Sequence, residues 1–168
     1  MKKVIVIGGT GLIGGAVVAA LRQFKDYDVI VVGVSGGDYQ VDITQADAIA
    51  KFYEQVGEFD ALVSTTGKVH FGELVKMTAA DHRLGIDNKL MGQINLVTLG
   101  LKHIKEGGSF TLTSGILNED PIRFGASAAM VNGAINGYVV GAALEMPREV
   151  RVNVVSPTVV TEALENYA

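Results

Sequence analysis

The glycine-rich run after the first apolar segment constrains the fold most strongly. Residues 4–7 are four consecutive aliphatic residues, and Gly8-Gly9-Thr10-Gly11-Leu12-Ile13-Gly14 follows them without a polar spacer. A short aliphatic run of this kind predicts a strand buried on both faces, as in a parallel sheet. After the glycines, apolar residues recur at helical spacing: Leu12, Ile13, Ala16, Val17, Ala20, Leu21 and Phe24. The sequence therefore predicts a strand, a tight turn and an amphipathic helix.

The spacing of these glycines is typical of a dinucleotide-binding turn. Gly8 would allow the turn, Gly11 would let backbone amides approach a pyrophosphate, and Gly14 would let the helix lie close to the sheet. The start of the helix would face the anion with free amides and a favourable dipole. The alternative is an ordinary strand-to-helix turn, which the same residues can form.

Composition indicates one globular domain. The chain has 168 residues, of which 48% are hydrophobic, so it can bury one substantial core, and we expect a single domain over residues 1–168. The formal charge is −4 and the basic residues are scattered, which argues against a nucleic acid or an anionic membrane as the main partner.

Other sequence features bear on location. Cysteine is absent, so neither disulfides nor thiolate chemistry is expected, in keeping with a cytoplasmic protein. Residues 125–144 carry no charge, but Ser127, Asn132 and Asn136 make this stretch a poor membrane helix. No membrane span is therefore expected.

Strand-like and helix-like segments alternate along the chain. Further strands are predicted over residues 28–34, 60–64, 109–113 and 150–155. Helices are predicted over residues 44–56 with Thr44 as the cap, over residues 73–104 with a break near Ala80 and Asp81 and an end at Gly107-Gly108, and over residues 124–146. This alternation predicts an α/β fold with right-handed crossovers, a doubly wound parallel sheet and helices on both faces.

Motifs distributed along the chain carry a family resemblance. Besides the glycine turn, they are Val41-Asp42-Ile43-Thr44, Ser64-Thr65-Thr66-Gly67, Thr113-Ser114-Gly115 and Arg151-Val152-Asn153-Val154-Val155-Ser156-Pro157. In this order the motifs resemble the short-chain dehydrogenase/reductase family over nearly the whole chain. The resemblance implies a Rossmann-type fold, an NAD(P) cofactor and a small carbonyl or alcohol substrate. Combined with the glycine turn, it gives these cofactor-binding candidates: Gly8, Thr10, Gly11, Leu12, Ile13, Gly14, Ser35, Asp42, Ile43, Ser64, Thr65, Thr66, Gly67 and Pro157.

The sequence departs from this family at the reactive groups. Phe124 stands where the family has a tyrosine and Ala128 where it has a lysine. A carbonyl reduced by hydride transfer needs a proton donor, which phenylalanine cannot supply. Ser114 remains at the end of a strand as a candidate to hydrogen-bond a substrate oxygen, or as a loop-capping serine. Lys89 stands at the family's asparagine position, where it is either a substitute acid or a solvated lysine on a helix surface.

Two functions stay open at this stage. One is an NAD(P)-dependent oxidoreductase with a divergent mechanism that uses Ser114 and Lys89 as catalytic residues. The alternative is a non-catalytic dinucleotide-binding redox sensor or interaction protein. No metal is expected, and among the other polar residues His70 is a weaker candidate at the mouth of the site, whereas Glu119, Asp120 and Arg123 are assigned no role.

The type of nucleotide is not fixed by the second strand. The segment Gly33-Val34-Ser35-Gly36-Gly37 carries no acid to bind a ribose 2′-hydroxyl, and the first acid is Asp38. Ser35 and the loop amides could receive a 2′-phosphate, although no lysine or arginine stands there. We favour NADP, and NAD stays open because Asp38 could fold back towards the ribose.

The last helix and the chain end give two further expectations. Gly133, Gly137 and Gly141 make a smooth stripe four residues apart, which favours close packing against another backbone. Because the family pairs this helix in its dimer interface, we expect a homodimer or homotetramer, the alternative being packing against the chain's own sheet. Only eleven residues follow Pro157, so either the site is very open or the sequence lacks a tail.

Overall fold

A single parallel sheet forms the centre of the structure, a computed structural model that describes residues 1–162. Within these residues, six strands pair in the order β3-β2-β1-β4-β5-β6, and all their pairings are parallel. The strands are β1 Lys2–Ile7, β2 Tyr27–Gly33, β3 Tyr39–Gln40, β4 Phe59–Ser64, β5 Ile104–Thr113 and β6 Arg151–Val155. The predicted doubly wound α/β fold is confirmed. The last six residues of the predicted domain, 163–168, lie outside the described residues.

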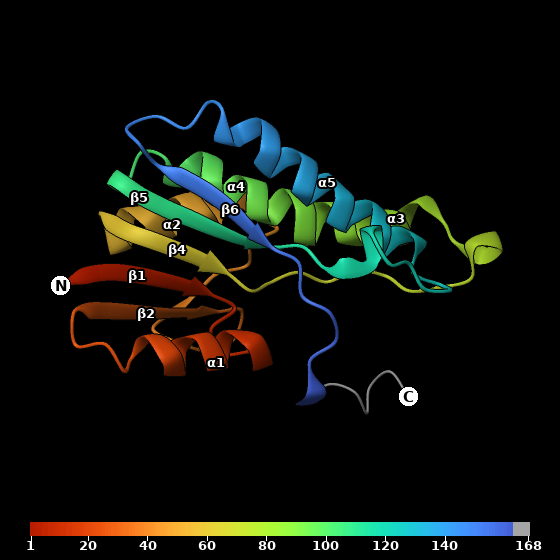
Figure 1. The fold of residues 1–168 in the computed structure, drawn as a ribbon, viewed down its shortest axis with the longest axis horizontal. Coiled ribbons are helices and arrows are strands. Elements are labelled where there is room, and N and C mark those ends of the chain that lie inside the picture. Colours follow the sequence, from red (N-terminus) through yellow and green to blue (C-terminus); the bar gives the residue numbers. More distant parts are fainter. Residues whose placement is uncertain (163–168) are drawn as a thin grey trace.

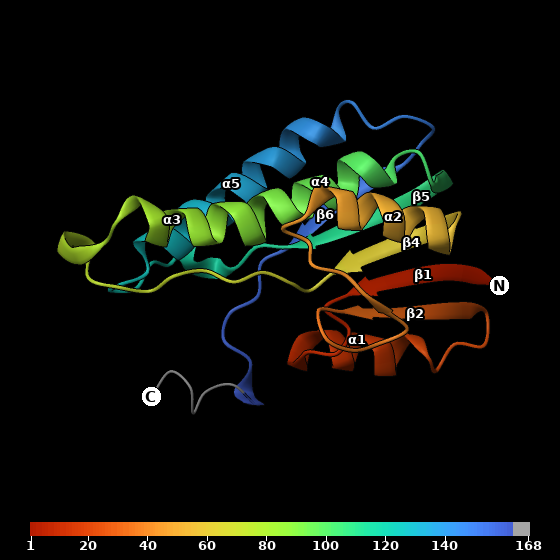
Figure 2. The same cartoon turned by 180° about the vertical axis from the view of Figure 1, so that it is seen from behind.

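Helices cover both faces of the sheet. They are α1 Leu12–Leu21, α2 Ala46–Val56, α3 Ala79–Gly85, α4 Gly92–Gly100 and α5 Ala126–Ala143. Short turns of other helical types are η1 Leu74–Lys76, the π-helical η2 Ile86–Met91, and η3 Ile116–Asn118. Helix α1 lies alone on one face, beside β1 and β2 (Figure 1), whereas α2, α4 and α5 lie together over the other (Figure 2).

The core follows this division. A large cluster of buried side chains, including Ile5, Phe59 and Phe110, fills the side covered by α2, α4 and α5. A small cluster of Val6, Val18 and Val31 lies under α1. Residues 4–7 are at most 5% exposed because β1 is paired on both edges and covered on both faces. This is the environment that the aliphatic run predicts.

The sequence was wrong about which side of α1 is buried. Gly14 and Val18 are the buried residues of this helix, whereas Leu12 and Ile13 are exposed at its start. Phe24 lies beyond the end of α1 and is also exposed. The apolar residues are spread round the helix, so their spacing alone did not identify the face that meets the sheet.

Other predicted boundaries are also corrected. Thr44 does not cap α2, because its hydroxyl donates to the Asp42 carboxylate and Gln45 occupies the cap position. The long helical region begins at Thr78, which forms a capping box with Asp81, and ends at Gly100 rather than at Gly107-Gly108. Those two glycines lie within β5, where the pairing with β4 shifts register.

All long strands end at the same edge of the sheet. The turns after β1, β4, β5 and β6 therefore gather there, which is where open parallel sheets bind ligands. Residues 156–160 continue from β6 past this edge towards the start of α1 (Figure 1). In the described part of the chain, no helix is both long and apolar enough to cross a bilayer.

Candidate active site

Two adjoining cavities lie at the carboxyl edge of the sheet. The larger has a volume of about 380 Å³ and the smaller about 260 Å³, and they share Ile13, Thr65, Thr158 and Val159. The smaller one is lined by residues 11–14 at the start of α1. The larger one is lined by the ends of β4 and β5, by η2 and by α5, with these residues among its walls: Thr66, Gly67, Lys89, Ser114, Ala128, Asn132 and Pro157.

The glycine turn is shaped by close backbone contacts. Gly8 has φ +79°, and a Cβ there would lie 2.6 Å from Cγ2 of Thr66. A Cβ at Gly14 would collide with the carbonyl oxygen of Gly8, so α1 approaches the turn only because position 14 has no side chain. Both glycines have the steric roles that the sequence predicted.

Backbone amides at the start of α1 face the smaller cavity. Gly11 is the cap residue and provides no side-chain acceptor, and the first amide to close a helical turn is Gly15 N–H, which donates to Gly11 O at 2.7 Å. The amides of Leu12, Ile13 and Gly14 precede it and have no partner within the helix. These donors and the helix dipole suit a phosphate group.

Lys89 is the unexpected feature of the larger cavity. Its Nζ donates to the carbonyl oxygen of Ser114 at 2.6 Å and to Oδ1 of Asn132 at 2.9 Å. Both partners are buried, with exposed fractions of 2% and 3%. Burial lowers the pKa of Lys89 to about 8. The interpretation of Lys89 as a solvated surface lysine is therefore wrong.

Local helix geometry and one buried amide position Lys89. The residue lies in η2, a π-helical turn between α3 and α4, and such turns are frequent at functional sites. Gln93, one turn later, is fully buried and donates to the carbonyls of Lys89 and Thr113, while its Oε1 accepts from Thr113 N–H. The Gln93 side-chain amide thus hydrogen-bonds η2 to the end of β5, next to Ser114.

The Ser114 hydroxyl lies in a short polar chain. Its Oγ is 2.6 Å from Oγ of Ser156, and Ser156 Oγ in turn donates to the carbonyl oxygen of Gly115 at 3.3 Å. Ser114 N–H donates to Val155 O, which joins the ends of β5 and β6. Because Ser156 has one proton and donates it to Gly115 O, the Ser114 hydroxyl donates to Ser156 in this arrangement. The Ser114 proton becomes free for a ligand in the cavity only when Ser156 turns its own proton to Ser114.

Helix α5 contributes Ala128 and Asn132, one turn apart, to the cavity wall. Phe124 lies before the helix in a left-handed conformation with φ 66°, is half exposed, and is not among the residues that line the cavity. Where the resemblance predicts a lysine, Ala128 offers only a methyl group. The cation that lines this cavity is Lys89, on the facing helical segment.

The remaining cofactor-binding candidates occupy different environments. Thr65 Oγ1 donates to Ile7 O, and Ser64 Oγ lies 2.9 Å from Thr66 Oγ1. Residues 64–66 are therefore hydrogen-bonded to one another and to the end of β1. Ile43 is buried in the core. Thr10, Ser35 and Asp42 are exposed and do not line either cavity.

The acid that could bind a ribose hydroxyl is engaged elsewhere. Asp38 accepts a hydrogen bond at Oδ2 from Val31 N–H at 2.8 Å, and its own N–H donates to Val31 O. This pair closes the loop after β2 and directs the carboxylate back along the strand. Val34, at the tip of the same loop, is 71% exposed.

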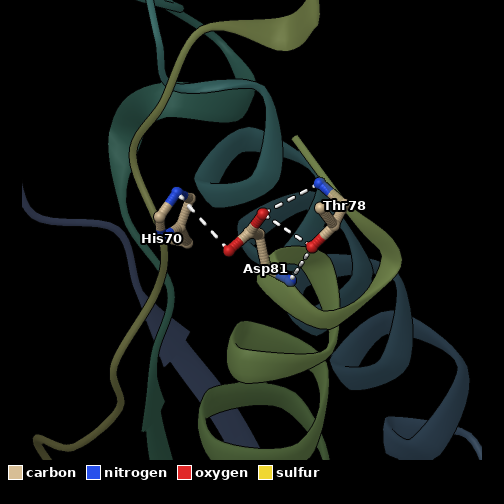
Figure 3. Close-up of polar contacts among 3 residues, drawn as sticks. All are labelled: His70, Thr78 and Asp81. Carbon is tan, nitrogen blue, oxygen red and sulfur yellow. Dashed lines mark hydrogen bonds and ion pairs between the residues drawn. The ribbon is translucent and has the colours of Figure 1, made fainter. Parts of the chain in front are cut away.

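His70 faces away from the reactive groups. Its Nε2 lies 3.9 Å from Oδ1 of Asp81, whose other oxygen accepts from the amide and hydroxyl of Thr78 (Figure 3). His70 is not among the residues that line the larger cavity. It contacts the capped start of α3 instead.

Sequence reasoning missed Asn132, Gln93 and Ser156 as parts of the site. Asn132 had a weak signal, since it is one of a few polar residues in an uncharged helix. Ser156 stood in the quoted motif of residues 151–157, but its partner Ser114 is 42 residues away in the chain. Gln93 had no signal, because its partner Thr113 is 20 residues away. Across residues 1–162, no group of three or more histidine, cysteine or acidic side chains is arranged to hold a metal ion.

Comparisons with known proteins give consistent relationships. A family profile described as "Enoyl-(Acyl carrier protein) reductase" matches residues 16–167. An uncharacterized oxidoreductase of Methylorubrum extorquens is 30% identical over 186 aligned positions, covering 96% of this chain and 74% of the relative.

Two solved structures share the fold closely. A protein from Listeria innocua is 48% identical with a TM-score of 0.95, covering 98% of this chain and 82% of its own. A small-chain dehydrogenase solved in complex with NADPH is 30% identical with a TM-score of 0.84, covering 93% of this chain and 69% of its own.

Proposed function

Because this chain belongs to the short-chain dehydrogenase/reductase family, we propose that it is an NAD(P)-dependent oxidoreductase whose Lys89 replaces the family's missing proton donor. An oxidoreductase of the short-chain dehydrogenase type is what the family establishes. The proposal adds the mechanism and the substrate class, a small carbonyl compound or the matching alcohol. The observation that carries it is the Nζ of Lys89, which lies in the cavity between Ser114 and Asn132.

The cofactor would lie across the two adjoining cavities. The amides of residues 12–14 would hold the pyrophosphate at the start of α1, and Thr65, Thr66 and Pro157 would border the nicotinamide end. A reduced nicotinamide bound there would supply a hydride. We favour NADP over NAD because Asp38 is engaged with Val31, and because a relative with 30% identity was solved with NADPH.

Lys89 would provide the proton. An ammonium has three N–H donors, and two of them are used by Ser114 O and Asn132 Oδ1. The third is available to a carbonyl oxygen in the cavity. As hydride adds to the carbonyl carbon, the oxygen gains negative charge, which Lys89 neutralises by giving up this proton and becoming a neutral amine. A pKa of about 8 suits that exchange near neutral pH.

Ser114 would position the substrate oxygen. Its hydroxyl is on the same strand end as the carbonyl that binds Lys89, so both groups lie on one side of the cavity. If the Ser156 proton turns from Gly115 O to Ser114 on substrate binding, Ser114 can donate to the substrate oxygen and hold it beside Lys89. The two residues act on one atom, as the divergent mechanism requires.

The first experiment is a titration of the purified protein with NADPH and NADH, followed by fluorescence, and then a screen of carbonyl compounds with the nucleotide that binds. Binding and oxidation of the nucleotide by a carbonyl compound would support the proposal. Binding without turnover across a broad screen would favour the redox sensor or interaction protein. Absence of binding would contradict both functions.

We also propose that the protein assembles as a homodimer or homotetramer through α5. A Cβ at Gly137 or Gly141 would meet no atom within 4 Å in the described chain, so these two glycines of the stripe are not packed, whereas Gly133 lies against Asn118. Val140 is 72% exposed on the same helix, and Leu144 just after it is 88% exposed. A second copy would cover these apolar groups and offset the cost of glycine within a helix.

The cytoplasmic location expected from the cysteine-free sequence stays a prediction. It agrees with a reductase that draws on a cellular nucleotide pool. Fractionation of cells that express a tagged chain would test it directly.

A further inference from the structure

The walls of the larger cavity are apolar away from Lys89 and Ser114. Val69 and Phe71 come from the segment after β4, Ile116 and Ile122 from the segment after β5, and Val159 from the segment after β6. Three separate connections therefore bring large apolar side chains to one space, and of these residues only Val69 packs against the buried core. A ligand with an apolar body would contact all three.

Several of these side chains are still in contact with water. Phe71 is 39% exposed, Ile122 is 52% exposed and Val159 is 40% exposed. Exposed apolar groups that gather at a cavity favour the binding of apolar surface, because a bound ligand removes both surfaces from water. Their position at the cavity that holds Lys89 places this surface beside the reactive groups.

The larger cavity is lined by few charged side chains. Within the described chain, Lys89 and Asp120 are the only ionisable side chains that line it. The ammonium of Lys89 is already bonded to Ser114 and Asn132. Asp120 is exposed and takes part in no ion pair among residues 1–162. The partners of Lys89 are neutral, and its remaining N–H is directed to the carbonyl oxygen of the substrate, so a carboxylate elsewhere on the same substrate would face the carboxylate of Asp120.

Taken with the proposed function, on which this step rests, we propose that the substrate is an uncharged, largely apolar aldehyde or ketone, and that Asp120 excludes carboxylates and phosphates. An anionic substrate would lose hydration and gain repulsion from Asp120. A neutral substrate would keep its carbonyl oxygen on Ser114 and Lys89 while its apolar body covers Phe71, Ile122 and Val159. The reaction is unchanged: hydride adds to the carbonyl carbon and Lys89 gives its proton to the oxygen. Asp120 thus determines specificity without touching the reacting atoms.

The test uses neutral and carboxylate forms of the same carbonyl compounds. Several pairs of different size, such as acetophenone with 4-acetylbenzoate and benzaldehyde with 4-carboxybenzaldehyde, are compared by kcat/KM and by binding to the enzyme loaded with oxidised nucleotide. The neutral member of each pair is expected to be favoured by at least about tenfold. Asp120→Asn should reduce this ratio, and Asp120→Lys should bring it to one or below. Glu119→Gln, at the exposed neighbour that does not line the cavity, should leave the ratio unchanged.

The outcomes separate this inference from the proposed function. Equal or better use of the carboxylates, or a ratio that Asp120→Lys leaves unchanged, would overturn the inference while the reductase activity stands. Failure of every neutral and every carboxylate compound to bind would also overturn it. Failure of the nucleotide itself to bind would contradict the proposed function instead.

Discussion

Lys89 and Asn132 meet across the larger cavity, with 2.9 Å between Nζ and Oδ1, although 43 residues separate them in the chain. Asn132 is one helical turn after Ala128, the position at which the family resemblance predicts a lysine. In this chain an amide on α5 holds a cation from the facing helical segment instead.

Removal of the Lys89 ammonium should abolish most of the turnover. Lys89→Met keeps a long apolar side chain but provides no proton, so kcat for carbonyl reduction should fall by roughly 10²- to 10⁴-fold. Nucleotide affinity, measured by fluorescence titration, should change little because the amides of α1 hold the pyrophosphate. Lys102→Met, at an exposed lysine outside the cavity, is the control and should retain full activity. Unchanged kcat in Lys89→Met would remove Lys89 from the mechanism.

The rate of reduction should depend on pH through Lys89. Its pKa is about 8, and only the protonated form can donate, so kcat/KM for reduction should decline above about pH 8. Alcohol oxidation needs the neutral amine and should rise towards the same pH. Stopped-flow or steady-state rates from pH 6 to 10 would show both limbs. Ser114→Ala should lower the rate without moving the midpoint of the pH profile. If the residual activity of Lys89→Met shows the same midpoint, the titrating group is not Lys89.

The pH dependence of the free energy of unfolding should also reflect the titration of Lys89. Burial lowers its pKa from 10.5 to about 8 in the folded protein, so the unfolded chain binds the proton more tightly. Below about pH 8 the charged, buried Lys89 destabilises the folded protein by the full amount, and this destabilisation disappears as the pH rises towards 10.5. Over this pH range the free energy of unfolding of the wild-type protein should rise by up to about 3 kcal/mol relative to that of Lys89→Met. This value follows from about 1.4 kcal/mol per pKa unit. Urea unfolding at several pH values would measure the difference, and a constant difference would contradict it.

Two neighbouring glycines in α1 should respond in opposite ways to alanine. Gly14→Ala places a Cβ against the carbonyl oxygen of Gly8, so the turn must shift and nucleotide binding should be lost or weakened at least tenfold. Gly15→Ala is the matched control, because its Cβ would come no closer than 3.9 Å to Gly9 O. It should retain binding and stabilise the helix by up to about 1 kcal/mol. Equal binding by both variants would show that the turn does not hold the nucleotide.

Assembly through α5 should be sensitive to one charge. Gly137→Glu places a carboxylate on the glycine stripe, and if a second copy covers this face the protein should become monomeric. Gln23→Glu adds the same charge at an exposed site after α1 and should leave the assembly intact. Analytical ultracentrifugation would determine the mass of each variant. An unchanged oligomer in Gly137→Glu would place the interface elsewhere.

Local sequence pattern was sufficient for most of the architecture. The aliphatic run of residues 4–7, the glycines and the alternation of segments predicted the parallel sheet and the glycine turn between β1 and α1. Boundaries were less certain where competing contacts were local but specific, as with Thr44, whose hydroxyl bonds Asp42 rather than the start of α2. The two-residue strand β3 was missed because so short a segment has no periodicity.

The sequence by itself determined the fold and the family, because both depend on residue types at short spacing. From Phe124 and Ala128 it also predicted the loss of the family's tyrosine and lysine, which stays a prediction. It left Lys89 undecided between a surface lysine and a substitute acid. Only the tertiary structure decided this, because the neighbours of Lys89 are Ser114, 25 residues away, and Asn132, 43 residues away. The burial that lowers its pKa and the partners that orient its protons come from β5 and α5 meeting η2 at the edge of the sheet. Such contacts exist only after the chain has folded, so no local pattern can predict them.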